Sequence, residues 1–315
     1  IMEENRNDPL TFIGFLLISI IIMFWYYSNQ DIPEIVENDA EKIEKTISDD
    51  KLLIANIPQE IEEDNKYDFQ QKKLILENDK IYMEIDTRGA NITMLNLKEF
   101  TNYNDDTLKL VDLDNSSFNI SIPNSYNESI DTENLIFDYD IIQTNKKVKL
   151  TGYISDKDFI EITYNLDNDS YMLDYQIKLN GFETYSNQNE LFLFWTKDSF
   201  RNSKSIDYEN RYTALSYGFE DEKDSYLAAT GSPDKVIDEV NWISYREHFF
   251  SSILMFENKL DQIQIFSENL ASVEELEKKY TKRFSTIIPI GINNSSSNFR
   301  FYFGPTDYNT LKEYN

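Results

Sequence analysis

Residues 160–179 decide the fold, and they read IEITYNLDNDSYMLDYQIKL. Apolar and polar side chains alternate in residues 160–166 and again in residues 171–179, a pattern that predicts two strands with one buried face each. The four residues between them, Asp-Asn-Asp-Ser at 167–170, are typical of a turn. The stretch therefore predicts an antiparallel hairpin. Its buried positions are Ile160, Ile162, Tyr164 and Leu166 on the first strand, and Tyr171, Leu173, Tyr175, Ile177 and Leu179 on the second.

The same alternation recurs from Leu74 onward. Ile81, Met83 and Ile85 lie two residues apart and are followed by a Gly-containing turn at residues 87–90. Many short strands separated by Asn, Asp, Ser and Gly turns, without long helical patterns between them, predict an antiparallel β-sandwich rather than an α/β fold. Further strands are predicted at residues 118–122, 148–154, 190–195, 262–266, 286–292 and 298–303.

The composition excludes several classes of partner and site. The 315 residues include 30 Lys and Arg against 57 Asp and Glu, a formal charge of −27 that would repel the phosphates of a nucleic acid. The chain has no cysteine, which excludes disulfides and thiolate chemistry, and a single histidine excludes a histidine-clustered zinc site. With 40% hydrophobic and 14% aromatic residues, the chain can nevertheless fill a large core.

Residues 10–27 differ from the rest of the chain. They read LTFIGFLLISIIIMFWYY, 18 uncharged residues that are long enough to span a bilayer as a helix and that end in an aromatic trio. A buried core helix and a cleaved signal peptide remain alternatives, but no small-residue cleavage pattern follows the run, so we expect an uncleaved signal anchor. The residues expected to contact lipid are Phe12, Phe15, Leu16, Leu17, Ile20, Ile21, Ile22, Phe24, Trp25 and Tyr26.

Residues 28–71 follow as an acidic segment that contains Pro33 and Pro58 and predicts a flexible, solvated tether. Arg6 is the only basic residue that could hold the N-terminus inside, but a long acidic domain is exported largely regardless of flanking charge. We therefore expect residues 1–9 in the cytoplasm, residues 10–27 in the membrane, and the chain after about residue 28 outside it.

The predicted domain offers few groups for catalysis. His248 has Glu247 beside it, but neighbouring residues point to opposite faces of a strand, so a structural histidine is expected. The pairs Asp112/Asp114 and Asp167/Asp169 resemble fragments of calcium loops but lack the glycine and glutamate of such loops. We expect no catalytic residue, no metal site and no cofactor, and hence a protein that is not an enzyme.

Short motifs with rare residues occur in a characteristic order. Arg88 and Gly89 lie in the first strand turn, Trp242 is followed by Phe249 and Phe250, and residues 301–305 read FYFGP, with Tyr302, Gly304 and Pro305 as the specific positions. With the opening Asn-Arg-Asn and the apolar run, this order resembles the membrane protein insertase family YidC. The resemblance is to the Gram-negative form, with features of the Bacteroidota branch. That family has two glycines in the first turn, where this chain has Gly89 and Ala90.

The resemblance implies both a fold and a role. The fold is an antiparallel β-supersandwich similar to galactose mutarotases at residues 72–304. A short helical segment at residues 305–315 then leads toward a second transmembrane helix. The role is to insert, fold and assemble integral membrane proteins at the bacterial inner membrane, with or without the Sec translocon. The implied partners are the lipid bilayer, nascent membrane proteins, the Sec translocon and its SecDF subunits. The family's membrane core and groove arginine are absent from this chain. The resemblance therefore implies that this part of the protein serves as an anchor and as a periplasmic scaffold or contact domain.

Two other interpretations remain open. A membrane-anchored carbohydrate-binding module of the mutarotase type would have a cleft lined by exposed Trp or Tyr with convergent carboxylates. An acidic envelope protein with a purely structural role would need no such cleft. In any of these proteins Trp242, Tyr245, Phe249 and Phe250 could simply belong to the core.

Overall fold

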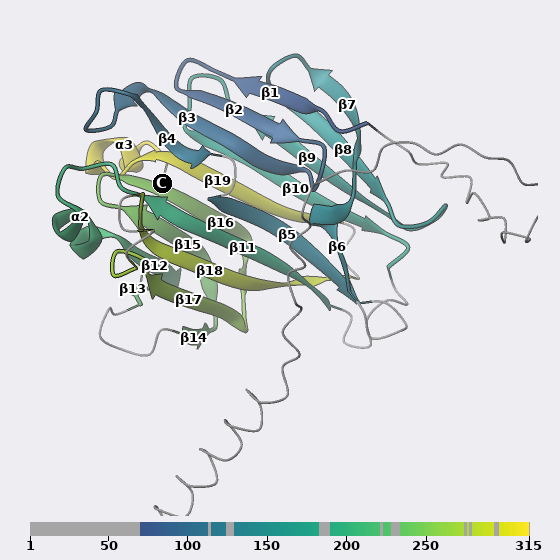
Figure 1. Ribbon diagram of the computed structural model, residues 1–315. Helices are drawn as coiled ribbons and strands as arrows, with labels where there is room; N and C mark the ends of the chain where they lie inside the picture. The colour runs from purple at the N-terminus through teal and green to yellow at the C-terminus, as the bar shows by residue number, and fades with distance from the viewer. Residues whose placement is uncertain are drawn as a thin grey trace, which may run out of the picture. The chain divides into compact units, whose positions relative to one another are not determined.

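The computed structural model describes residues 70–112, 115–123, 129–182, 190–220, 223–227, 234–273, 276, 279–292 and 296–314. The predicted anchor at residues 10–27, the N-terminus before it and most of the tether lie outside these residues. No helix in the described part of the chain has the length and apolar character needed to cross a membrane. The described elements form three antiparallel sheets, which confirms the prediction of a mostly β, layered fold (Figure 1).

The first sheet is a four-stranded meander in which the strands pair in chain order. Gly89 and Ala90 turn the chain between its second and third strands with left-handed φ angles of +75° and +51°. The strands are β1 (Lys73–Glu77), β2 (Ile81–Asp86), β3 (Asn91–Thr101) and β4 (Thr107–Asp112).

The second sheet has nine strands and is built around the predicted hairpin. Its order is β13 (Lys223–Tyr226), β12 (Ala214–Phe219), β15 (Val240–Glu247), β16 (Phe250–Leu260), β19 (Ser297–Pro305), β10 (Met172–Asn180), β9 (Phe159–Leu166), β8 (Lys147–Tyr153) and β7 (Asp138–Gln143). Two hairpins and the late strand β19 therefore meet at its centre.

The third sheet has six strands. Its order is β14 (Asp234–Ile237), β17 (Ile263–Asn269), β18 (Tyr280–Gly291), β11 (Glu190–Phe200), β5 (Ser116–Pro123) and β6 (Ser129–Asp131). Helical turns are short: η1 (Thr132–Asn134), α2 (Ile206–Tyr212) and α3 (Tyr308–Lys312). The position of α3 confirms the expected short helical segment near the end of the chain.

The hairpin forms as predicted. Tyr164 pairs with Tyr175, and Ile162 with Ile177, so the two predicted apolar faces fall on the same side of the sheet. The turn passes through Asp169 in the left-handed region, with a φ of +44°. The buried hydroxyl of Tyr164 donates a hydrogen bond of 2.6 Å to the carbonyl of Ala90 in the four-stranded sheet.

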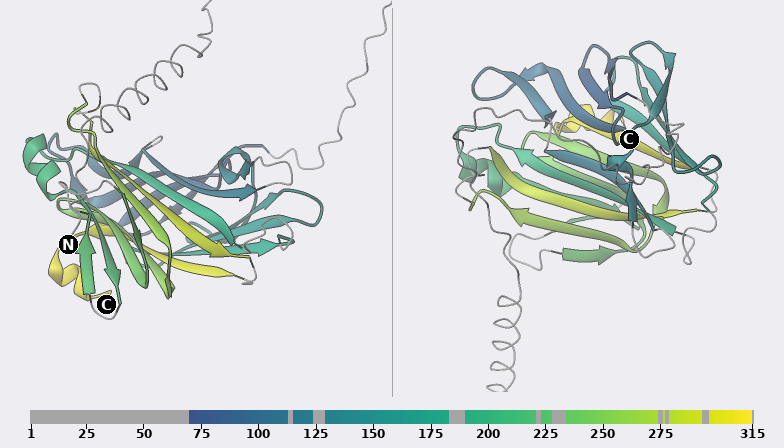
Figure 2. Two further views of the ribbon diagram at one scale, coloured as in Figure 1. Left: turned by 90° about the horizontal axis from the view of Figure 1, so that it is seen from below. Right: turned by 45° about the vertical axis from the view of Figure 1, so that its right-hand side comes forward.

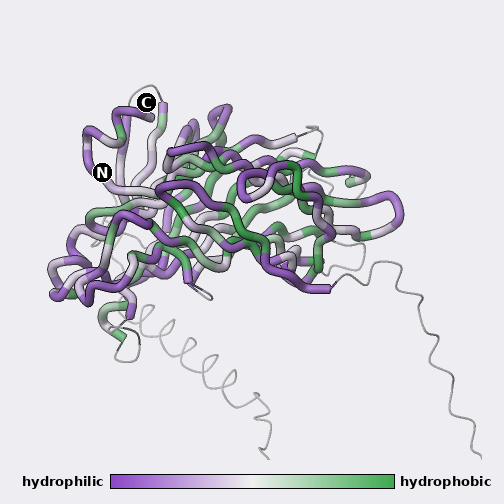
Figure 3. The backbone as a smooth tube through the Cα atoms, turned by 90° about the horizontal axis from the view of Figure 1, so that it is seen from above, coloured by the Kyte–Doolittle hydropathy of each residue, from purple (hydrophilic) through white to green (hydrophobic). Residues whose placement is uncertain are grey.

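The nine-stranded sheet is covered on one face by the other two sheets (Figure 2). The six-stranded sheet is joined to it by the indole of Trp195, which stacks on the ring of Tyr245 at a centroid distance of 3.8 Å. The four-stranded sheet is joined to it by Phe100, whose ring lies 5.1 Å from that of Phe250. Strands such as β8 and β9 alternate between buried and partly exposed positions. In Figure 3 the hydrophobic stretches are concentrated in the middle of the described unit, while the loops at its margins are mostly hydrophilic.

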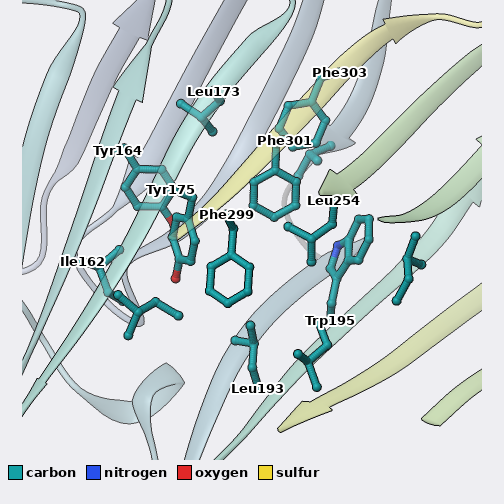
Figure 4. Packing of buried hydrophobic residues seen from close by; sticks show 14 of the residues in the cluster. Ile162, Tyr164, Leu173, Tyr175, Leu193, Trp195, Leu254, Phe299, Phe301 and Phe303 are labelled. Atoms are coloured by element: carbon teal, nitrogen blue, oxygen red, sulfur yellow. The ribbon is translucent and has the colours of Figure 1, made fainter. Parts of the chain in front are cut away.

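Strand β19 supplies the middle of the core. Figure 4 shows Phe299, Phe301 and Phe303 on one face of this strand, between Tyr175 and Trp195. The rings of Phe301 and Phe303 stack at 5.1 Å, and Phe301 also meets the edge of Trp195 at 5.6 Å. Because such edge and stacked contacts add to the burial of large apolar areas, this strand carries much of the packing energy of the domain.

One charged pair is buried between the sheets. The ammonium of Lys197 on β11 lies 2.5 Å from the Glu247 carboxylate at the end of β15, and it donates a hydrogen bond of 2.8 Å to the Ser252 hydroxyl. Both charged side chains are buried. Burial raises the pKa of Glu247 above its ordinary value, as does the negative charge of Glu209, while the charge of Lys197 opposes the rise.

Replacing Lys197 by Met keeps the side-chain length but leaves the Glu247 carboxylate without its counter-charge. We expect the free energy of unfolding near neutral pH to fall by about 3–5 kcal/mol. The pKa of Glu247 is raised in the folded state, so the folded variant binds a proton before the unfolded chain does. Stability therefore increases as the pH falls, and the deficit should be smaller at about pH 5 than at about pH 7. Urea denaturation of the detergent-solubilised chain, followed by tryptophan fluorescence, measures both.

Two matched variants serve as controls. Lys149 makes exposed ion pairs with Asp140 and Glu161, so Lys149→Met should cost less than about 1 kcal/mol. Adding Glu247→Leu to Lys197→Met should recover most of the loss, because the uncompensated charge is gone. A double variant as unstable as the single one would contradict this account.

Candidate functional site

The two late family motifs lie side by side, although about fifty residues separate them in the chain. In the nine-stranded sheet Phe250 pairs with Pro305. The backbone N–H of Thr306 donates a hydrogen bond of 2.7 Å to the Phe249 carbonyl, and the Thr306 hydroxyl donates one of 3.1 Å to the His248 carbonyl. The β15–β16 turn is therefore fastened to the segment that leads into α3.

The position of the Tyr302 side chain requires a glycine at position 304. The Tyr302 side chain reaches along its own strand toward the C-terminal end, and its hydroxyl donates a hydrogen bond of 2.7 Å to the Pro305 carbonyl. A Cβ atom at position 304 would lie 2.7 Å from that hydroxyl oxygen and 2.9 Å from the Tyr171 ring. Only glycine fits between these groups, so this motif has a structural role in holding the end of β19.

Trp242 lies on the face of the nine-stranded sheet that is turned away from the core. It pairs with Gly218 on β12 and with Met255 on β16. A Cβ atom at position 218 would lie 2.1 Å from the indole nitrogen, so glycine makes room for the ring. The indole is partly exposed, and it lines a surface hollow rather than the core.

The structure does not bring Arg88 and Gly89 to these residues. They lie in the β2–β3 turn, where the N–H of Arg88 donates to the Asp86 carboxylate at 2.8 Å. The N–H of Gly89 donates to the Leu135 carbonyl at 2.8 Å. A Cβ atom on Gly89 would lie 3.0 Å from the backbone of Glu133. The turn is therefore a joint between the four-stranded sheet and the segment around η1.

His248 lies in the β15–β16 turn and not on a strand, with a left-handed φ of +42°. The two residues were expected to point to opposite faces of one strand. Instead, Glu247 is the last residue of β15 and His248 lies in the turn after it. Glu247 points into the core toward Lys197, while the imidazole packs among surface rings. Burial, and then the charge of Arg246, lower the pKa of His248. These contacts support the expected structural histidine.

His248 belongs to an exposed group of rings that we call the aromatic cluster: Tyr208, Tyr212, His248 and Phe249. The imidazole stacks on Tyr212 at 5.1 Å, meets Tyr208 edge-on at 5.2 Å and lies 3.7 Å from the Phe249 ring. Tyr208, Tyr212 and Phe249 are 49%, 39% and 62% exposed. The interpretation of Phe249 as a core residue is therefore wrong, whereas Tyr245 and Phe250 are buried as that interpretation required.

Two hollows flank this end of the domain and share Arg246 and Thr306. The larger, of about 930 Å³, lies against the aromatic cluster and is lined also by Phe100, Tyr103, Lys204 and Asp307. The smaller, of about 490 Å³, lies on the outer face of the nine-stranded sheet under α3 and is lined by Trp242, Tyr308, Asp224 and Lys312.

A third hollow, of about 450 Å³, lies farther along the same outer face. Two of its lining residues are Asp174, which accepts a hydrogen bond of 3.0 Å from Arg300, and Glu257, which accepts one of 2.7 Å from Asn298. The hollow with Trp242 and Tyr308 has Asp224 as its acidic lining residue. The carboxylates of Asp174 and Glu257 therefore lie in a different hollow from Trp242 and Tyr308, and His248 lines the larger hollow beside the aromatic cluster.

The sheets and the joined motifs together define an antiparallel β-supersandwich domain with an aromatic end. Residues 73–315 match the sequence model described as the YidC periplasmic domain. The chain belongs to this family.

Similar relatives carry the name membrane protein insertase YidC. That of Parabacteroides distasonis is 27% identical over 98% of this chain and 53% of its own length. That of Azobacteroides pseudotrichonymphae is 28% identical over 98% and 51%, and that of Porphyromonas gingivalis is 24% identical over 98% and 53%. The chain thus spans about half the length of these relatives.

Solved structures with a similar arrangement include two of the mutarotase type. A galactose mutarotase related enzyme from Lactobacillus acidophilus is 10% identical, with a TM-score of 0.47 over 74% of this chain and 97% of its own. A galactose mutarotase-like protein from Lactobacillus casei is 11% identical, with a TM-score of 0.49 over 74% of this chain and 100% of its own.

Sequence reasoning missed the half of the aromatic cluster that comes from α2. Tyr208 and Tyr212 are four residues apart, a spacing that places two side chains on one face of a helix. Ser205 caps this helix by accepting a hydrogen bond from the N–H of Tyr208. The Ser cap and the tyrosine spacing are the two signals that could have predicted this helix. A seven-residue helix between strands is too short to show a clear helical periodicity.

Gly304→Ala tests the structural account of the late motif. The added methyl group would overlap the Tyr302 hydroxyl and the Tyr171 ring, and we expect a loss of about 1–3 kcal/mol in the free energy of unfolding. Asn298→Ala on the exposed side of the same strand should change it by less than about 0.5 kcal/mol. Urea denaturation provides the comparison, and equal effects of the two substitutions would show that the Tyr302–Gly304 contact has no special weight.

Proposed function

We propose that the chain is the N-terminal part of a YidC-type insertase, which inserts, folds and assembles integral membrane proteins with or without the Sec translocon. In this proposal the chain supplies an anchor and a periplasmic scaffold. The observation that carries the proposal is the match to the YidC periplasmic domain over residues 73–315. The pairing of the Phe249–Phe250 motif with the Tyr302–Pro305 motif supports the proposal, because it gives these two motifs a structural role in the domain.

The proposed topology follows from the apolar run and the charge of the chain. Residues 1–9 lie in the cytoplasm, residues 10–27 cross the inner membrane and residues 28–71 form the tether. Residues 72–304 fold in the periplasm, and residues 305–315 lead toward a second membrane span. The formal charge of −27 supports export, because an inside-negative potential favours acidic domains on the outer side.

The proposed partners are the bilayer, nascent membrane proteins, the Sec translocon and its SecDF subunits. We place the contact with a Sec subunit at β7, which is the last described strand at its edge of the nine-stranded sheet. Ile141 and Ile142 on this strand are 59% and 56% exposed. An edge strand with adjacent exposed aliphatic side chains is suited to pairing with an extended segment of another chain.

A chimaera tests the proposed function. Residues 1–315 of this chain would replace the corresponding half of the Parabacteroides distasonis relative in a strain depleted of its own insertase. We expect growth to be restored, and we expect protease added to spheroplasts to cleave the chimaera after residue 28. The unaltered relative is the positive control, and a cytoplasmic protein reports the integrity of the spheroplasts. No growth from a chimaera that reaches the membrane in normal amounts would contradict the function, and full protection from protease would contradict the topology.

The β7 contact has a matched control on another edge. Ile141→Glu with Ile142→Glu places charge on the proposed pairing edge, and we expect SecDF recovered with the tagged chain from native membranes to fall about tenfold. Val236 is 52% exposed on β14, the edge of the six-stranded sheet, and Val236→Glu should leave recovery unchanged. Equal recovery with both variants would remove β7 as the contact.

A further inference from the structure

The aromatic cluster lies at the end of the domain where both short helices are found. In Figure 1 and in the left view of Figure 2, α2 and α3 lie at the same end of the described unit. Tyr308, the first residue of α3, is 74% exposed and adds a further ring to this end. Thr306, two residues before Tyr308, lines both the hollow that borders the cluster and the hollow that Tyr308 lines. Rings from three separate segments of the chain are thus exposed together.

The chemistry of these rings is amphipathic. Tyr208, Tyr212 and Tyr308 each combine an apolar ring with a hydroxyl, and Phe249 lies among them with a purely apolar ring. Side chains of this kind are enriched where one end can be apolar and the other hydrated, which is the environment of the lipid headgroup region. A conventional core would have buried the rings completely.

The local charge also differs from that of the whole chain. The two hollows at this end are lined by three basic residues, Lys204, Arg246 and Lys312, and by two acidic ones, Asp224 and Asp307. The chain as a whole has 30 basic residues against 57 acidic ones. The exposed Asp207 and Arg211 on α2 and Glu313 after α3 bring the two signs into balance. A near-neutral surface on a strongly acidic protein is the part that anionic lipids would repel least.

We infer that the aromatic cluster and Tyr308 rest in the headgroup region of the bilayer and hold this end of the domain against the membrane. The inference rests on the proposed function, because that function puts the domain in the periplasm and places a membrane span after α3. It adds a second attachment beyond the anchor and fixes which end of the domain faces the lipid. The occupant of the surface is the lipid interface itself, not a client protein or a Sec subunit.

The absence of cysteine makes a clean test possible, because one introduced cysteine is a unique labelling site. Asp207→Cys places an environment-sensitive fluorophore beside Tyr208 on α2, and Asp140→Cys places the same label on β7 as a control. Both substitutions remove one exposed acidic residue. The full chain would be reconstituted with phosphatidylethanolamine and phosphatidylglycerol, together with a small share of lipid that carries a nitroxide on its headgroup.

We expect quenching at position 207 to be roughly threefold stronger than at position 140, because an interfacial surface lies within the headgroup layer. Tyr208→Ser, Tyr212→Ser and Phe249→Ser together, in the Asp207→Cys chain, should reduce quenching to the level of position 140. An unchanged emission spectrum of the chain's three tryptophans, one of which is the buried Trp195, would show that the fold is intact. Should the triple variant unfold, Tyr308→Ser alone must still lower quenching at position 207.

Other results overturn the inference. Equal quenching at the two positions would show that this end does not approach lipid, and quenching that survives removal of the rings would show that they are not responsible. Shielding of the label at position 207 only after purified Sec subunits are added would assign the surface to a protein partner. The chimaera's growth is measured without this assay, so failure here leaves the proposed function standing, and failure of growth leaves the vesicle result interpretable.

Discussion

The contact on which the domain depends is the stack of Trp195 on Tyr245, one ring from each of the two larger sheets, at 3.8 Å. The Tyr245 hydroxyl lies 2.8 Å from the Trp195 carbonyl, to which it donates, and 2.7 Å from the Thr286 hydroxyl. Burial raises the pKa of Tyr245 well above its ordinary value, so the phenol stays protonated and remains a donor. This arrangement sets the distance between the two sheets. The phenylalanines of β19 and the Lys197–Glu247 pair fill the rest of the space between them. The outer face of the nine-stranded sheet is then free to carry hollows and motif residues.

Much of the fold could be predicted because a buried face imposes a period of two on the sequence. The hairpin of β9 and β10 was expected from residues 160–179, and its strands pair with the two expected apolar faces on the same side of the sheet. Strands β12, β13 and β14 were not expected, because they are short edge or near-edge strands whose outer residues include Tyr226 and Val236, both exposed. Strand β11 extends to Phe200, past the predicted end at 195, since pairing with β18 continues there although residues 197–199 read Lys-Asp-Ser. Tertiary pairing overrides local pattern at such places.

The candidate site was predictable in part. Phe249 and Phe250 could be named from the sequence, but no period distinguishes the exposed ring from the buried one when a turn falls between strands at His248. The partnership of Lys197 with Glu247 was likewise hidden, because a lysine in a strand is normally interpreted as solvent-exposed. Both results arise from contacts between residues far apart in the chain. The family resemblance located these motifs, and the structure supplied their physical reasons: glycine at 304 for the Tyr302 ring, and glycine at 218 for the Trp242 ring.

The central place of β19 has a mechanical consequence. This strand lies between β16 and β10, and it continues through Pro305 and Thr306 into α3. Tyr314 packs against Tyr302 at 5.3 Å, and its hydroxyl accepts a hydrogen bond of 3.3 Å from the N–H of Tyr171. A force applied to α3 would therefore act along the axis of a central strand. The backbone hydrogen bonds to β16 and to β10 would resist this force at the same time, whereas an edge strand would be held on one side only. Tension applied at that helix would be shared between the strands on both sides of β19.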